Sequence, residues 1–135
     1  MENLLYRKFT KEEARMLNPL QLAFVGDGVY EVFIRNYILN NNKELSTHKL
    51  HVEAIKYVKA HAQSEIIRRI ESDLTEEEIY IYKRGRNTKS ATVPKNADLA
   101  EYRAATGFEA LVGYLYLINE IDRLNTILLK SVERE

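Results

Sequence analysis

The sequence predicts an all-α protein, and three observations lead to this expectation. The 135 residues contain no strand-like alternation and no hairpin dipeptide, so no strand is expected. Capping boxes, which open helices, occur at 10–13 (TKEE) and 75–78 (TEEE). Two strongly apolar stretches, at 20–34 and 106–118, are each long enough for several helical turns. We therefore expect a helical bundle that contains both stretches.

The first half of the chain predicts three helical segments. Asn18 and Pro19 are typical of an N-cap followed by the first helical residue, so they mark the start of a long helix. The expected elements are a short helix after Thr10, a long helix from 19 to about 39, a polar turn at 40–42, and a segment from about 47 to 70, capped by Ser46 or Thr47 and broken near 61–64.

The second half predicts three more helices and a long loop. The expected elements are a helix from 76 to about 83, a loop at 85–96 that contains Pro94, a helix capped by Asp98, and a last helix from about 119 with apolar residues at helical spacing. There is no internal repeat and no low-complexity stretch. We therefore expect residues 1–135 to form a single domain.

The composition excludes several classes of protein. A formal net charge of zero argues against a protein that coats nucleic acid without specificity, but it leaves room for a local basic patch. The lack of cysteine excludes disulfides and thiolate metal sites. No apolar run approaches the ~20 residues that cross a bilayer. The first residues lack the apolar run and the cleavage site of a signal peptide, and no glycine-rich phosphate loop is present. We expect a cytoplasmic protein with no membrane contact and no nucleotide cofactor.

Four of the five glycines lie in the two apolar stretches, and each stretch carries a central acid, Asp27 or Glu109. A glycine inside a helix costs about 1 kcal/mol relative to alanine. A helix that is apolar on nearly every side belongs in the middle of a bundle. We therefore expect both helices to be central and in contact, with Gly26, Gly28 and Gly113 allowing their backbones to approach. Glycines that serve packing alone would leave two buried acids unexplained.

Asp27 and Glu109 are the candidate catalytic residues and metal ligands. Mg²⁺ prefers oxygen ligands, takes one or two carboxylates from the protein, and leaves its other positions to water and substrate phosphate. Mn²⁺ could replace it. Bound between the two acids, the metal would neutralise phosphate charge and lower the pKa of an attacking water. Glu31, one turn beyond Asp27, is either a further ligand or the ion-pair partner of Arg35, and we favour the ion pair.

The segment 83–95 carries five basic residues and no acid. These candidate RNA-binding residues are Lys83, Arg84, Arg86, Lys89 and Lys95. Lysine and arginine bind phosphate groups and supply most of the sequence-independent affinity for a nucleic acid. Taken alone, the segment could equally be a solvated basic loop. Beside a metal-binding acid pair, we interpret it as the substrate-binding element.

At these residues the chain resembles the catalytic domain of the ribonuclease III family. The first motif of that family stands here as Ala23–Val29 (AFVGDGV), and the second as Thr106–Gly113 (TGFEALVG). The basic segment and Tyr102-Arg103 resemble the smaller Mini-III branch in particular. Ala23 and Thr106 stand where the larger enzymes have acids, which leaves two acids of four; the same losses mark the Mini-III branch.

The resemblance implies a homodimeric helical bundle that cleaves double-stranded RNA with Mg²⁺, through Asp27 and Glu109. It further implies that the substrate is precursor 23S ribosomal RNA, cut in the duplex formed by its paired ends. No double-stranded-RNA-binding domain is expected, so substrate choice would come from the catalytic domain or from a ribosomal protein that acts as helper. The alternatives are a catalytically inactive RNA- or ribosome-binding module on the same fold, and a helical dimer that acts as a protein-interaction scaffold.

Overall fold

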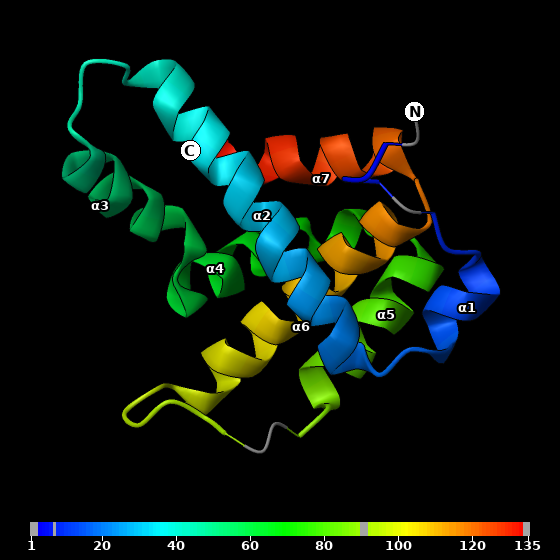
Figure 1. The fold of residues 1–135 in the computed structure, drawn as a ribbon. Coiled ribbons are helices and arrows are strands. Elements are labelled where there is room, and N and C mark those ends of the chain that lie inside the picture. The colour runs from blue at the N-terminus through cyan, green and yellow to red at the C-terminus, as the bar shows by residue number, and fades with distance from the viewer. Residues whose placement is uncertain (1–2, 7, 90–91, 134–135) are drawn as a thin grey trace.

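Two long helices, α2 (Pro19–Asn41) and α6 (Leu99–Leu117), cross and pack against each other at the centre of the fold (Figure 1). This arrangement comes from a computed structural model that describes residues 3–6, 8–89 and 92–133. Helices α5 (Glu76–Asn87) and α4 (Ala60–Ile70) pack on α6, and α3 (Thr47–Val58) packs on α2. The prediction that the two apolar stretches form contacting central helices is therefore confirmed.

The remaining elements are α1 (Lys11–Met16), a short 3-10 helix η1 (Glu71–Asp73) and α7 (Ile121–Val132). No strand occurs in the described ranges, so the all-α prediction is confirmed. Across the same ranges, no helix combines the length and the apolar character needed to cross a bilayer.

The predicted helix starts are present, and side chains cap them. Thr10 and Thr75 each accept a hydrogen bond from the backbone of the residue three positions later, and a glutamate completes each capping box. Asn18 forms a third capping box with Gln21, and Asp98 accepts from the backbone of Glu101 at the start of α6. These contacts satisfy backbone donors that have no partner within the helix.

Helix α5 is longer than predicted, and the reason is Gly85. The sequence predicts that this helix ends near Lys83 and that a loop begins at Gly85, but the helix continues to Asn87. A Cβ on Gly85 would lie 2.8 Å from the Cβ of Ala110 and 2.9 Å from the Cα of Gly107. The glycine therefore serves close packing of α5 on α6 and does not end the helix. Residues 90 and 91 of the predicted loop lie outside the described residues.

The predicted break near 61–64 lies earlier, at Lys59. This residue ends α3 and precedes α4, with an extended backbone (φ −65°, ψ 153°). Ser46 caps α3 as expected. The last helix begins at Ile121, after Asn119 turns the chain with a positive φ of 63°.

The close approach of α2 and α6 depends on two of the three glycines expected to allow it. A Cβ on Gly26 would overlap the backbone carbonyl oxygen of Glu109 and lie 2.7 Å from its carbonyl carbon. A Cβ on Gly113 would overlap the carbonyl oxygen of Leu22. Gly28 has nothing within 4 Å of its Cβ position, so the expectation of a packing role for it is wrong.

Helix α6 is largely buried, but α2 is not buried on every side, which corrects the expectation for this helix. Phe24 is 82% exposed and Val32 is 69% exposed, while Leu22, Tyr30 and Ile34 face the core. Helix α2 therefore has one apolar face in the core and a second that no described residue covers.

Replacing Gly26 with alanine should destabilise the fold strongly. The new methyl group would meet backbone atoms of α6, which cannot move aside as a flexible side chain can. We expect a loss of about 3 kcal/mol in the free energy of unfolding, the upper end of typical overpacking costs. Denaturant titration measures it. Gly28→Ala is the matched control and should stabilise by up to about 1 kcal/mol; equal effects of the two substitutions would contradict the packing role of Gly26.

Candidate active site

The crossing of α2 and α6 brings the two candidate catalytic acids together. Gly26 contacts the backbone of Glu109, and the next residue along α2 is Asp27. The side chains of Asp27 and Glu109 lie within hydrogen-bonding contact of each other. The contact between the two helix backbones therefore determines the spacing of the two carboxyl groups.

The two acids differ in exposure, which corrects the expectation that both are buried. Asp27 is exposed, and Glu109 is partly buried. Asp27 and Gly28 both line an open cavity of about 870 Å³ on the uncovered face of α2. The acid pair is therefore at the surface, where a large substrate can reach it.

Burial, followed by the hydrogen bond and the charge of the nearby Asp27 carboxyl, raises the pKa of Glu109 to about 8. Glu31 adds a smaller upward effect on this pKa, and the hydrogen bond from Gln63 opposes it. Two carboxyl groups in contact do not ionise together easily, because their charges repel. In the metal-free protein, Glu109 therefore retains a proton near neutral pH.

Glu31 makes the ion pair that the sequence favours for it. Its Oε2 lies 3.1 Å from Nε of Arg35, one turn along α2. Its charge still raises the pKa of Glu109, so it lies near the acid pair without being free of its own partner. This placement suits a residue that adds negative potential to the site.

Gln63 is the residue of the site that sequence reasoning missed. Its Nε2 donates to the backbone carbonyl of Val58 at 2.9 Å and to Oε2 of Glu109 at 3.4 Å. It lies on the buried face of α4 with Ile66, Ile67 and Ile70. A lone amide on a face of isoleucines is a detectable signal, because a buried polar group is costly unless it is hydrogen-bonded.

The donor set suits a hard divalent cation. It consists of oxygen atoms alone, and two carboxylates match the number that Mg²⁺ takes from a protein. Among the described residues there is no group of three or more histidine, cysteine, aspartate or glutamate side chains that could hold a metal ion. A cation placed here would therefore rely on water and substrate for its other ligands.

The five basic residues predicted to bind RNA do not behave alike. Arg84 donates from its guanidinium to the backbone carbonyls of Arg15 at 3.0 Å and Leu17 at 3.3 Å. Arg86 lies over the ring of Tyr82 at 5.6 Å. Arg84 therefore ties α5 to the end of α1 and to the residue before the N-cap of α2, so its guanidinium already has partners.

The three predicted lysines have no such partner. Lys83, Lys89 and Lys95 are exposed, and their ammonium groups make no ion pair or hydrogen bond with the rest of the described chain. Lys89 lines a small pocket with Arg103 and Tyr102, at the base of the connection between α5 and α6. These three ammonium groups are available to a phosphate backbone.

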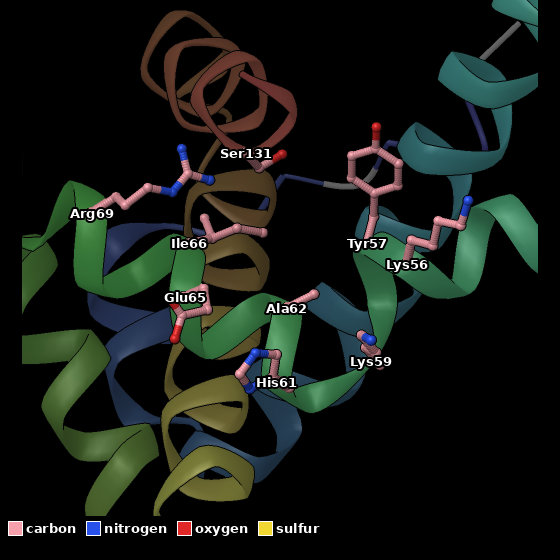
Figure 2. A pocket seen from close by; sticks show the side chains of 9 residues that line it. All are labelled: Lys56, Tyr57, Lys59, His61, Ala62, Glu65, Ile66, Arg69 and Ser131. Atoms are coloured by element: carbon pink, nitrogen blue, oxygen red, sulfur yellow. The ribbon is translucent and has the colours of Figure 1, made fainter. Parts of the chain in front are cut away.

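A second large cavity, of about 460 Å³, lies beside α3, α4 and α7 and does not have the properties of a metal centre. Figure 2 shows Arg69 and Ser131 on one side of this cavity and His61 on the opposite side. Its one carboxylate, Glu65, is paired with Arg68 at 3.0 Å. Because it offers no second acid, the Asp27–Glu109 pair remains the candidate metal site.

Residues 20–120 match the Ribonuclease III domain, and this range contains both acids and all five basic residues. The chain belongs to the ribonuclease III family. A Mini-ribonuclease 3 from Clostridium tetani is 55% identical to it over 121 residues, which are 90% of this chain and 80% of that protein. A Mini-ribonuclease 3 from Thermoanaerobacter sp. (strain X514) is 52% identical over 124 residues, which are 92% of this chain and 87% of that protein.

A crystal structure of a protein from Fusobacterium nucleatum also resembles this ribonuclease III-family chain. It has a TM-score of 0.77 and 35% sequence identity, and the match covers 85% of this chain and 91% of that one. The family resemblance expected from the two motifs is confirmed, and the chain is an endoribonuclease of the ribonuclease III type.

The metal-free protein should lose stability with rising pH through Glu109. The pKa of this carboxyl is about 8 in the fold and 4.5 in its ordinary state. Its favourable contribution to the free energy of unfolding is therefore complete below pH 4.5 and is lost as the pH rises through about 8. We expect the wild type to lose stability relative to Glu109→Gln over that range, measured by thermal unfolding in a chelator. Parallel curves for the two proteins would contradict the raised pKa.

Proposed function

We propose that this endoribonuclease hydrolyses phosphodiester bonds in double-stranded RNA and depends on Mg²⁺, which Mn²⁺ could replace. The observation that carries the proposal is the contact between Asp27 and Glu109 at an exposed helix crossing. Two carboxyl groups that resist joint ionisation are suited to share a cation. Their position at the surface suits a substrate as large as an RNA duplex.

Two of the three acids are metal ligands in this proposal, and the third acts on them from nearby. Asp27 and Glu109 would supply the anionic oxygens that hold the cation, and Glu31, whose charge Arg35 partly offsets, adds a smaller negative potential. When bound, a divalent cation neutralises charge on the phosphodiester and lowers the pKa of an attacking water. Glu109 would have to lose its proton to solvent before its carboxylate could hold the cation.

We propose that Lys83, Lys89 and Lys95 bind the phosphates on either side of the cleaved bond. Their free ammonium groups support this role. Arg84 contributes mainly by holding α5 against the end of α1, and Arg86 contacts Tyr82 within α5 itself. The narrow major groove of A-form RNA hides the base edges, so shape and 2′-hydroxyl contacts should dominate recognition. Binding through phosphate should be strongly dependent on salt.

We propose that the chain acts as a symmetric homodimer that uses the uncovered face of α2. Cutting both strands of a duplex requires two acid sets, which a two-fold axis supplies. Phe24 and Val32 are exposed on this face. Leu5 is also exposed and lines the same cavity as Phe24, and the exposed Leu4 precedes it in the chain. An apolar surface of this kind is typical of an interface. Light scattering on the wild type measures the oligomeric state, and a monomer would contradict this part.

The substrate proposed from the family resemblance is precursor 23S ribosomal RNA, matured in the cytoplasm. We propose that residues 1–135 act as one catalytic domain. RNA choice would then depend on the surface of this domain or on a ribosomal protein bound with the RNA. The exposed lysines, which have no partner among the described residues, support direct contact with the duplex.

Replacing Asp27 with asparagine should abolish cleavage while the fold is retained. The side chain is exposed, so the change removes charge without disturbing packing. Substitutions of groups that only support metal ligands cost about 10–100-fold, so loss of a ligand should exceed about 100-fold. Cleavage of a duplex RNA with Mg²⁺ measures the effect. Asp122→Asn, which alters an exposed acid on α7, is the control; normal cleavage by Asp27→Asn would refute the proposal.

Replacing Lys89 and Lys95 together with glutamine should weaken RNA binding and flatten its salt dependence. The slope of log affinity against log salt should fall by about one for each lysine that contacts phosphate. Lys43 and Lys49, replaced together in the same way, form the control, because they lie near the connection between α2 and α3, at the opposite end of the molecule (Figure 1). An equal slope for the two double variants would remove the 89–95 region from the RNA interface.

A further inference from the structure

Gln63 occupies a position where an apolar side chain would be the ordinary choice. It is 2% exposed, and the other residues on this face of α4 include Ile66, Ile67 and Ile70. Its amide is therefore removed from water within an apolar layer. Such a group is destabilising unless its hydrogen bonds are made, so its contacts indicate what it does.

The contacts of this amide determine which end faces the acid pair. The two neighbours within hydrogen-bonding distance are the carbonyl of Val58, at 2.9 Å, and Oε2 of Glu109, at 3.4 Å. The Val58 carbonyl can only accept, so the NH₂ group must face it, and the opposite orientation of the amide would place oxygen against oxygen there. Nε2 therefore points to Glu109.

The other end of the amide has no partner. Oε1 of Gln63 is buried and accepts no hydrogen bond from the described residues. An unpaired buried acceptor is unfavourable, and an apolar side chain of similar shape would avoid this cost. The amide therefore provides hydrogen bonds to the Val58 carbonyl and the Glu109 carboxyl, while its own oxygen stays unpaired.

We infer that Gln63 is a positioning residue that orients the Glu109 carboxylate for the divalent cation. The inference rests on the metal-dependent cleavage proposed above. The backbone of Glu109 is held by contact with Gly26, and Gln63 holds its carboxylate from the opposite helix layer, through α4. Hydrogen bonds that orient a metal-binding carboxylate change metal affinity without touching the metal.

The same amide also caps the carbonyl at the end of α3, so a purely structural role is the alternative. The two roles differ in what they change. A structural role affects the stability of the fold, whereas a positioning role affects the affinity for the cation. The experiment must therefore measure metal binding directly, separately from cleavage.

The test is titration of the whole chain with Mn²⁺ alone, followed by the electron paramagnetic resonance signal of the free ion. Gln63→Met keeps the length and volume of the side chain and removes the amide. We expect its Mn²⁺ affinity to fall by about tenfold. Raising the Mg²⁺ concentration should restore its kcat on duplex RNA and leave its KM for RNA unchanged.

Ser64→Ala is the matched control. Ser64 is also buried on α4, but its hydroxyl donates to the carbonyl of His61 within the same helix, and no hydrogen bond joins it to Glu109 among the described residues. We expect it to lose stability and to bind Mn²⁺ as the wild type does. If Gln63→Met does not fold, Gln63→Asn keeps the amide but shortens it, and the same tenfold loss is expected.

Three results would overturn the inference. Mn²⁺ affinity of Gln63→Met equal to that of the wild type would leave the amide with a structural role alone. An equal loss in Ser64→Ala would mean that any disturbance of α4 weakens the site. Failure of the wild type itself to bind Mn²⁺ would overturn the proposed function as well, and this result is distinguishable because it does not depend on any variant.

Discussion

Contact between the backbones of α2 and α6 is the constraint on which the site depends. Gly26 meets the carbonyl of Glu109, and Gly113 meets the carbonyl of Leu22, so no side chain separates the helices at their crossing. An ordinary interhelical distance is 8–10 Å and leaves side chains between the axes. Here the close approach puts the carboxyl on α2 against the carboxyl on α6. The two glycines lower the helix propensity of α2 and α6, but they allow the backbones to meet and so keep the two acids close together.

The two carboxyl groups of the acid pair repel each other when both are ionised, and the described residues supply no cation between them. Glu109 is partly buried beside a second carboxyl and has a third acid, Glu31, nearby, and these factors keep its proton in place in the metal-free protein. Arg35 offsets the charge of Glu31, but the two other acids have no cationic side chain as a partner among the described residues. A group of acids left in this state is typical of a site completed by a ligand.

Much of the fold could be predicted because it is determined locally. The capping residues Thr10, Asn18 and Thr75 act within one helical turn, so the sequence around them is enough to place the helix starts. Gly85 is the opposite case. A glycine after a basic pair is typical of a helix end, and only the packing of α5 against Ala110 shows why the helix continues.

The site divides in the same way. Asp27 and Glu109 could be proposed from two apolar stretches with central acids, because helices of that kind pack together. The exposure of Asp27 could not be predicted from the sequence, because it depends on which face of α2 lacks a neighbour. Gln63 lies 46 positions from Glu109 in sequence, and only the packing of α4 on α6 brings its amide to the carboxylate.

The position of Arg84 changes how an alanine scan of the basic segment should be read. Its guanidinium holds the end of α1 and the carbonyl immediately before the N-cap of α2, the helix that carries Asp27. Truncating it would free the N-terminal end of that helix as well as remove a positive charge. A scan scored by cleavage alone would therefore count Arg84 as a nucleic-acid contact even where the loss came from a displaced α2.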